Sequence, residues 1–332
     1  MRFAEWGELR FHQWLERRLG SQGEALGVGD DAALLPRSRA RLAVTTDAVV
    51  EGVHFRRDWF SWSEIGRRAT YGCLSDLAAV CARPLAVLLT LGIPDDLSAE
   101  AVRGFTGAVA AAAAEFGAAL VGGDTTESAT FFADLVAIGE TRRPWLRTGA
   151  LPGDVLAVTG ALGAPAAAIA LLEAGAGRSA GWPHLRRRLV APRPRIAEAL
   201  ALAQSPIHAA MDLSDGLMLD ASRLAAASGV RAIIEAERIP VAEGVPEAAR
   251  KLGRAVVEFA ASGGEEYELL LALPEDGLGQ ARRRLAPLDC PLTVVGRVEA
   301  GRGEARLVDS AGRPVTLPSA GWEHYGGARR EG

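Results

Sequence analysis

The segment Thr141–Asp154, TRRPWLRTGALPGD, divides the chain into two halves that each alternate apolar strand-like runs with helical stretches. Arg, Gly and Pro interrupt both periodicities there, which is typical of a boundary between domains. The chain has 332 residues and is therefore longer than one typical core requires. We expect two domains, formed by residues 1–148 and residues 149–332.

The mixed order of strand-like and helical runs predicts the α+β class rather than a uniform series of βαβ units. Strands are expected at Leu42–Thr46, Leu85–Ile93, Ala118–Val121, Phe131–Gly139, Val155–Thr159, Val256–Ala261, Tyr267–Ala272 and Leu292–Val298. Helices are expected over residues 64–82, with Ser63 as the cap, and over Ala99–Phe116.

Charge and hydropathy exclude two classes of partner. The net charge is −4, so no general basic field favours nucleic acid, and we expect the arginine-rich run Arg186–Arg195 to be a solvated helix face and loop. No apolar run approaches the roughly 20 residues that cross a bilayer. The charged N-terminal residues lack the apolar core of a signal peptide, so we expect a cytoplasmic protein.

A subset of acidic residues falls beside Gly, Ser and Thr between apolar runs. These acids are expected in short turns, except Asp76, which lies within the predicted helix above small residues. The segments are Gly29–Asp31, Thr45–Asp47, Ser75–Asp76, Gly123–Thr125 and Asp212–Gly216. Carboxylate and hydroxyl oxygens are the ligands that Mg²⁺ prefers. The pattern therefore predicts magnesium sites.

Simpler interpretations of the same acids stay open. The pair Gly29-Asp30 is also compatible with a turn closed by its own side chain. Asp212 and Asp215 are compatible with helix capping, and Asp76 with a solvated helix face.

Bound Mg²⁺ explains how acidic residues can lie beside a phosphate, because the ions neutralise charge that bare carboxylates would repel. The chain has almost no lysine, which is the usual phosphate-binding residue of a nucleotide-binding loop. Lys251 is its sole lysine, and the surrounding KLGRAV is no phosphate-binding loop. Arg147 is the side chain that we expect to add a guanidinium contact to a phosphate.

Seven segments resemble, in the same order, the sequence blocks of the thiamine-monophosphate kinase family. They are GVGDDAALL, TTDAVVEGVHF, LSDLAAVCARP, LVGGDTT, MDLSDGLMLD, GGEEYELL and GWEHY, and they extend from about Glu24 to Tyr325. This family belongs to the ATP-binding superfamily that includes aminoimidazole ribonucleotide synthetase and selenophosphate synthetase.

The resemblance implies an ATP-dependent kinase that converts thiamine monophosphate to thiamine diphosphate by direct in-line transfer, the last step of thiamine diphosphate synthesis. It implies a homodimer in which the N-terminal mixed sheets pair. Residues 1–148 would then bind ATP and Mg²⁺ and dimerise, and residues 149–332 would be an α/β sandwich that completes the site. The acceptor is already an ionised phosphate, so no general base or covalent nucleophile is expected.

The resemblance also implies the roles of individual residues. Several Mg²⁺ ions would be bound by Asp30, Thr45, Thr46, Asp47, Asp76, Asp124, Asp212 and Asp215. ATP would be contacted by Gly123, Asp124, Arg147 and Ser214. The substrate would be contacted by His54, Glu265 and Trp322. Thr106 stands where the family often has an aromatic residue at adenine, and its neighbour Phe105 is the expected substitute.

Two alternatives remain at this point: a sister ATP-dependent synthetase, and a non-catalytic protein of the same fold that binds Mg²⁺ and nucleotide. A selenophosphate synthetase would carry a reactive cysteine or selenocysteine in its N-terminal segment, whereas no cysteine precedes Cys73. The complete set of acidic residues argues against a non-catalytic protein.

Overall fold

The computed structural model describes residues 2–6, 8–19, 39–177 and 181–322. By contacts the chain divides into two compact units. Unit 1 comprises Met1–Pro144 together with Val190–Ile196, and unit 2 comprises Trp145–Leu189 together with Ala197–Gly332. The functional division at residue 148 stays a prediction. The block GVGDDAALL, with Asp30, lies outside the described residues.

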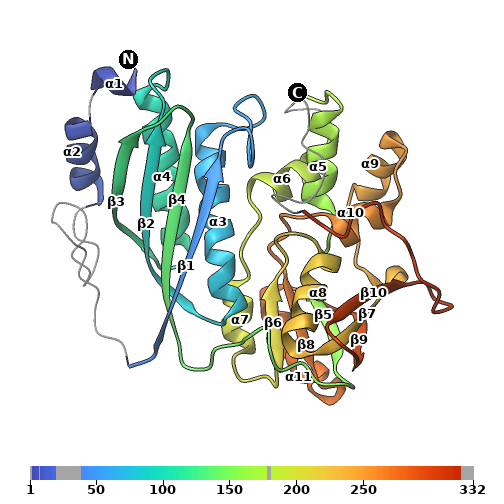
Figure 1. The fold of residues 1–332 in the computed structure, drawn as a ribbon. Helices are drawn as coiled ribbons and strands as arrows, with labels where there is room; N and C mark the ends of the chain where they lie inside the picture. The colour runs from blue at the N-terminus through green and yellow to red at the C-terminus, as the bar shows by residue number, and fades with distance from the viewer. Residues whose placement is uncertain (1, 7, 20–38, 178–180, 323–332) are drawn as a thin grey trace. The chain divides into compact units, whose positions relative to one another are not determined.

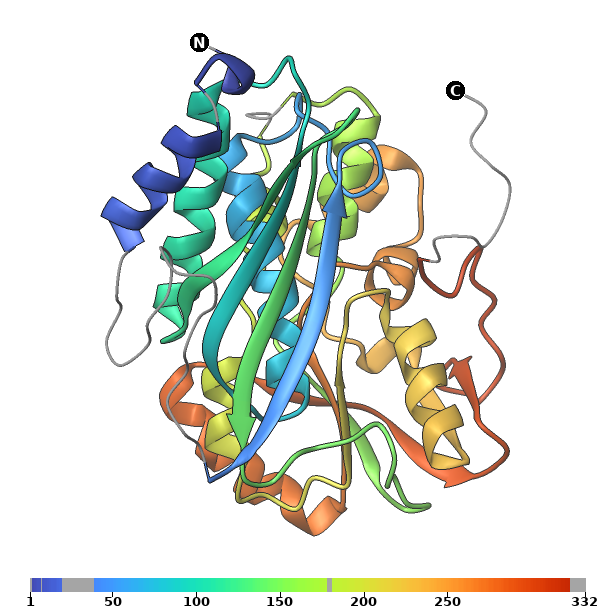
Figure 2. The ribbon, with the colours of Figure 1, turned by 60° about the vertical axis from the view of Figure 1, so that its left-hand side comes forward.

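Unit 1 is built on a four-stranded sheet with the order β1-β4-β2-β3 (Figure 1). The strands are β1 (Arg41–Val50), β2 (Arg83–Ile93), β3 (Ala119–Glu127) and β4 (Phe132–Thr141). β4 is antiparallel to both β1 and β2, and β2 is parallel to β3. Figure 2 shows the helices α3 (Trp62–Ala79) and α4 (Ala99–Glu115) on one face of this sheet. The short helices α1 (Phe3–Trp6) and α2 (Glu8–Leu19) precede it.

Helix α3 begins two residues earlier than its pattern predicts. The N-cap is Ser61 and not Ser63, because the Ser61 hydroxyl accepts from the Glu64 backbone N–H while the Glu64 carboxylate accepts from that of Ser61. Gly66 lets α3 approach α4 closely, since a Cβ there would lie 2.4 Å from the carbonyl oxygen of Phe105. The two helices therefore form one tightly packed layer against the sheet.

The opposite face of the sheet carries apolar side chains. Leu42 and Val44 on β1 are 61% and 65% exposed. Val136 and Ile138 of β4 lie on the same face, because they are register partners of Thr46 and Val44. Period-two alternation thus gives β1 and β4 one face that packs on α3 and one apolar face that does not.

Unit 2 contains a six-stranded sheet with the order β10-β7-β9-β5-β8-β6. Its strands are β5 (Val155–Thr159), β6 (Ala209–Asp212), β7 (Val230–Glu235), β8 (Leu269–Leu273), β9 (Leu292–Ala300) and β10 (Glu304–Val308). The pairs are antiparallel except β10–β7. Its helices are α5 (Ala164–Glu173), α6 (Pro183–Val190), α7 (Ile196–Leu202), α8 (Leu217–Ser228), α9 (Val245–Leu252), α10 (Val256–Ser262) and α11 (Leu278–Leu285), with 3₁₀ turns at Ala236–Arg238, Glu275–Gly277 and Ala286–Leu288.

The strand predicted at Val256–Ala261 is wrong, because this segment forms helix α10. Its β-branched beginning favours a strand locally, but Glu258 closes the first helical turn by accepting from the Ala255 backbone N–H at 3.3 Å. Phe259, Ala260 and Ala261 are then buried in the core of the unit. Tertiary burial has decided between two conformations that the short apolar run permits.

No helix in the described ranges is long and apolar enough to span a membrane.

Candidate active site

In unit 1 three predicted magnesium ligands lie on the helix-covered side of β1. Thr45 Oγ1 donates a hydrogen bond of 2.6 Å to Oδ2 of Asp76, which lies near the end of α3. Asp47 is two residues beyond Thr45 on the same strand and so shares its face. β1 is an edge strand, and all three residues are partly exposed. These oxygen atoms form a donor set suited to a hard cation.

Cys73 borders this group but is not suited to be a ligand. Its thiol is buried, and Sγ lies 3.4 Å from the carbonyl oxygen of Leu135. Burial raises the pKa of Cys73 well above its usual value, and the charges of Asp47, Asp76 and Asp134 raise it further. The residue therefore stays a neutral packing thiol, and Cys81 and Cys290 are buried as well.

The other predicted ligands of unit 1, Thr46 and Asp124, lie on the opposite face of the sheet. Thr46 Oγ1 donates a hydrogen bond of 2.7 Å to Oδ1 of Asp134 on β4. Thr90 of β2 is the register partner of both Asp134 and Asp124, which places these side chains in one row. Gly123 permits close pairing of β3 with β2, because a Cβ there would lie 1.8 Å from the Leu89 carbonyl oxygen.

The expectation of turns is wrong for two of the acidic segments in unit 1. Thr45, Thr46 and Asp47 lie inside β1, and Asp124 lies inside β3. Neighbouring residues of a strand point to opposite faces, so Thr45 and Thr46 do not converge. Asp134 was missed, although an aspartate among the apolar residues FFADLVAIG is the signal that could have identified it.

His54 lies in the turn that follows β1. Its Nδ1 accepts a hydrogen bond of 3.0 Å from the backbone N–H of Val50, and its carbonyl oxygen accepts from the guanidinium of Arg68 at 2.9 Å. Because Nδ1 is an acceptor, a neutral His54 ring carries its proton on Nε2. The fold thus fixes both the backbone and the ring of this predicted substrate contact.

The predicted substitute for an adenine-contacting aromatic residue is contradicted. Phe105 on α4 is fully buried, and its ring lies against that of Phe131 with a centroid distance of 5.1 Å. Thr106 is 1% exposed. Both side chains are buried in unit 1, so neither presents a surface to a base.

In unit 2 the predicted residues converge on the turn between β6 and α8. Asp212 ends β6 and is buried, while Ser214 and Asp215 occupy the turn. The backbone N–H of Glu265 donates to the Ser214 carbonyl at 2.7 Å, and that of Trp322 donates to the Asp215 carbonyl at 2.9 Å. Residues separated by up to a third of the chain therefore meet at one place.

Glycines make this convergence possible. A Cβ on Gly264 would lie 2.7 Å from the Ser214 carbonyl oxygen, and one on Gly321 would lie 2.5 Å from that of Asp215. Each glycine precedes a predicted substrate contact, Glu265 or Trp322. Trp322 is 48% exposed, and a partly exposed indole ring is of the kind that stacks on flat ligands.

Helix capping does not account for Asp212 or Asp215. The N-cap of α8 is Gly216, which makes no side-chain capping bond. The backbone N–H groups of Asp215 and Gly216, just before α8, instead donate to the buried carboxylate of Asp220, each at 3.1 Å. Burial raises the pKa of Asp220 to about 6, and Arg223 bridges Asp220 and Asp215. Asp220 therefore supports the turn that carries the predicted ligands.

Arg147 also belongs to unit 2. Its carbonyl oxygen accepts a hydrogen bond of 2.8 Å from the Ser228 hydroxyl at the end of α8, and the residue as a whole is exposed. The backbone anchor and the accessible guanidinium suit the predicted phosphate contact.

The described side chains do not assemble a complete metal centre, since no group of three or more His, Cys, Asp or Glu residues among them could hold an ion. The donor sets around Thr45 and Asp212 consist of carboxylates and hydroxyls, which fit Mg²⁺. An ion that takes only one or two protein carboxylates fills its other positions with water and phosphate oxygens. Both sets are therefore compatible with Mg²⁺ that arrives with a nucleotide.

Comparisons with known proteins identify the family of this chain. Residues 29–141 match the family described as AIR synthase related protein, N-terminal domain, and residues 152–309 match its C-terminal domain. The thiamine-monophosphate kinase of Rhodopirellula baltica is 37% identical over 290 residues, which cover 84% of this chain and 85% of that protein.

Solved structures extend the likeness to the fold. The thiamine-monophosphate kinase from Stenotrophomonas maltophilia K279a is 33% identical, with a TM-score of 0.80 over 95% of this chain and 99% of that one. A structure of AaThiL complexed with AMPPCP and TMP is 32% identical, with a TM-score of 0.77 over 98% of this chain and 99% of that one. The present chain belongs to the thiamine-monophosphate kinase family.

Proposed function

We propose that this protein transfers the γ-phosphoryl group of ATP to thiamine monophosphate, which yields thiamine diphosphate and ADP. The observation that carries the proposal is the convergence of Asp212, Ser214, Asp215, Glu265 and Trp322 at the turn before α8. These residues come from three separate sequence blocks, and together they offer metal ligands, a nucleotide contact and a substrate contact. The relative bound to AMPPCP and TMP has the same fold over nearly the whole chain.

The chemistry of the acceptor sets what the protein must supply. The terminal phosphate of thiamine monophosphate is largely ionised near neutral pH, so the reaction needs alignment and charge neutralisation rather than a general base. Glu265 can accept from an aminopyrimidine or pair with a cationic ring, and Trp322 can stack on it. His54 would contact the same substrate through Nε2.

Bound Mg²⁺ would neutralise the transferring phosphates and orient them. We propose Thr45, Asp47 and Asp76 as one set of ligands and Asp212 with Asp215 as another. The remaining predicted Mg²⁺ ligands are Asp30, Thr46 and Asp124. ATP would be held further by Gly123, Asp124, Arg147 and Ser214.

We further propose that the protein is a homodimer that pairs through the helix-free face of the unit 1 sheet. Leu42 and Val44 leave large apolar side chains exposed there, beside Val136 and Ile138. Exposed apolar patches of this kind mark protein–protein contacts. A Val44→Asp variant should shift the mass in light scattering from dimer to monomer, and a monomeric wild-type protein would contradict this proposal. We place the reaction in the cytoplasm, where ATP is available.

The test of the activity is direct. Purified protein is incubated with ATP, Mg²⁺ and thiamine monophosphate, and thiamine diphosphate is measured by chromatography. We expect stoichiometric ADP and thiamine diphosphate, and loss of both when the metal is removed by a chelator. Failure to form thiamine diphosphate at saturating Mg²⁺ would refute the assignment.

A further inference from the structure

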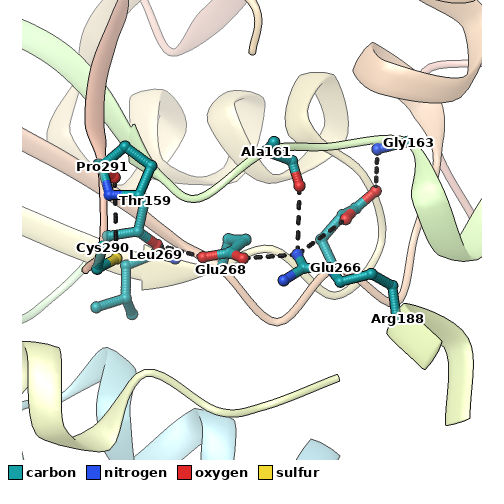
Figure 3. Close-up of polar contacts among 9 residues, drawn as sticks. All are labelled: Thr159, Ala161, Gly163, Arg188, Glu266, Glu268, Leu269, Cys290 and Pro291. Atoms are coloured by element: carbon teal, nitrogen blue, oxygen red, sulfur yellow. Dashed lines mark hydrogen bonds and ion pairs between the residues drawn. The ribbon is translucent and has the colours of Figure 1, made fainter. Parts of the chain in front are cut away.

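Behind the segment that carries Glu265 lies a cluster of two buried carboxyl groups and one guanidinium, which Figure 3 shows. Glu266 and Glu268 are only 2% and 1% exposed, and Arg188 reaches them from helix α6. The reaction proposed above assigns no role to these three residues. Buried charges of this kind persist only where hydrogen bonds and countercharge hold them.

Glu268 occupies a site that fits its carboxylate closely. Its Oε1 accepts from Arg188 Nη2 at 2.6 Å, and its Oε2 accepts from the Thr159 hydroxyl at 2.7 Å. Thr159 Oγ1 in turn accepts from the backbone N–H of Leu269 at 2.8 Å. A Cβ at Gly160 would lie 2.2 Å from Glu268 Oε1, so a larger residue there would displace this carboxylate from its position.

Glu266 is held differently. Its Oε1 accepts from the backbone N–H of Gly163 at the start of α5. Its Oε2 has no hydrogen-bond partner within the described part of the chain, and Arg188 Nη2 lies 3.9 Å away, too far for a hydrogen bond. Burial raises the pKa of Glu266 to about 8, and the charges of Glu268 and Glu265 add to this rise, while Arg188 opposes it. Arg188 therefore balances chiefly the charge of Glu268.

The backbone is strained on both sides of Glu266, at Glu265 and at Tyr267. Glu265 has φ of 67° and Tyr267 has φ of 51°, both in the left-handed region that non-glycine residues rarely adopt. Such conformations cost on the order of 1–3 kcal/mol each and persist only where surrounding contacts determine them. Burial alternates along the segment, since Glu265 and Tyr267 are partly exposed and Glu266 and Glu268 are buried.

Arg188 contacts three separate parts of this structure through one nitrogen. Nη2 donates to Glu268 at 2.6 Å and to the Ala161 carbonyl oxygen at 3.2 Å, and it faces Glu266. It thereby ties α6 to the β5–α5 connection and to the strained segment. The backbone of that segment then donates from Glu265 and Tyr267 to the turn before α8.

We propose that Arg188 is a positioning residue, which holds residues 264–268 in the strained conformation that presents Glu265 to thiamine monophosphate. This inference rests on the proposed function for the identity of the substrate, but the anchoring of the segment does not depend on it. In this role Arg188 acts through its contacts with Glu268 and Glu266.

The test compares Arg188→Met with Arg187→Met, a matched control at an exposed position on the same helix. Arg188→Met should raise KM for thiamine monophosphate roughly tenfold or more and leave KM for ATP within about twofold, whereas Arg187→Met changes neither. Arg188→Lys keeps a cation beside Glu268 and should restore part of the loss. A purely structural defect would lower the fraction of active protein, and with it the maximal rate, without raising KM for thiamine monophosphate relative to KM for ATP.

Amide hydrogen exchange provides a second measurement that needs no activity. In Arg188→Lys, and in Arg188→Met if it folds, the N–H groups of Glu265 and Tyr267 should exchange at least about tenfold faster than in wild type. Unchanged exchange at both amides, or equal increases in both KM values, would overturn the positioning role. Faster exchange in a protein that does not phosphorylate thiamine monophosphate would retain the anchor and refute the proposed function instead.

Discussion

The predicted ligands of unit 1 and those of unit 2 are positioned by different kinds of structure. Thr45, Thr46 and Asp47 lie within a regular strand, and Thr45 is held by a side-chain hydrogen bond to Asp76 on a helix. The residues of unit 2 lie around a turn, where backbone hydrogen bonds bring in Glu265 and Trp322. One group is thus ordered by strand geometry and the other by close approach of loops.

This difference determines which neighbours in sequence can act together. A strand sends successive side chains to opposite faces, so Thr45 meets Asp76 while Thr46 meets Asp134. A turn built with close glycine contacts can instead gather distant segments, as at Gly264 and Gly321. The unit 2 turn therefore gathers residues predicted to contact metal, nucleotide and substrate, whereas unit 1 offers two separate donor sets.

The largest effect is expected from removing the charge at the centre of the unit 2 group. Asp212→Asn should lower kcat roughly 100-fold or more with little change in the unfolding temperature, because it removes a charged metal ligand and conserves shape. Steady-state kinetics and thermal unfolding measure the two quantities. The control is Asp289→Asn, an exposed left-handed position in the same unit that asparagine tolerates. Near-normal turnover of Asp212→Asn would remove it from the metal shell.

In unit 1 two adjacent threonines test the separation of the faces. Thr45→Val should raise the Mg²⁺ concentration at half-maximal rate about tenfold, because it removes a hydroxyl that orients Asp76. Thr46→Val removes the contact to Asp134 on the other face and should raise this concentration less than Thr45→Val does, because Thr45, Asp47 and Asp76 keep their arrangement. Magnesium titrations of the kinase rate compare the two. The reverse order would move the metal to the face with Asp134 and Asp124.

An intermediate effect concerns the pH dependence of stability in unit 2. Burial raises the pKa of Glu266 from an ordinary 4.5 to about 8. At a pH between these two values, Glu266 is protonated in the folded protein and ionised in the unfolded chain, so the unfolded chain binds fewer protons than the folded protein. The free energy of unfolding should then fall as pH rises, by up to about 1.4 kcal/mol per pH unit from this group. Glu266→Gln stays neutral in both states and should lose that slope.

Urea unfolding at several pH values from about 5 to about 8 measures this slope. Glu275→Gln, at an exposed position of the same unit, should keep the wild-type slope. If Glu266→Gln and wild type show parallel curves, Glu266 is ionised in the folded protein and the charge balance with Arg188 is different.

The smallest effect is expected at Thr106, whose buried hydroxyl has no hydrogen-bond partner among the described residues. Thr106→Val should raise the free energy of unfolding by up to about 1 kcal/mol and leave KM for ATP unchanged. The same change at Thr70 should destabilise, because that hydroxyl donates to the Gly66 carbonyl oxygen at 2.8 Å. A raised KM for ATP in Thr106→Val would return this residue to the nucleotide site.

The sequence identified elements best where a strong local signal agreed with burial. The helix expected at Ala99–Phe116 is α4, Ala99–Glu115, with a serine cap at its start and Gly117 in the left-handed conformation after its end. Val256–Ala261 had no such signal, and its apolar run formed a helix instead of a strand. Local propensity is weak for short apolar runs, so packing decides them.

The arginine run shows the same limit for side chains. The sequence favoured a solvated face for Arg186–Arg195, and Arg187 is indeed exposed. Arg188, the next residue, turns toward two buried glutamates that follow it by nearly eighty positions. No pattern within the run distinguishes these neighbours, because their difference arises from the segment that packs beside them.

The sequence by itself determined the α+β class, the family and the identity of the acidic and aromatic residues, because these follow from residue types in ordered blocks. The tertiary structure decided which of them meet. It separated Thr45 from Thr46, buried Phe105, and brought Glu265 to Ser214 and Trp322 to Asp215. The physical reason is that contacts between distant segments depend on strand register, close glycine approaches and buried charge balance, and none of these is a property of one local stretch of sequence.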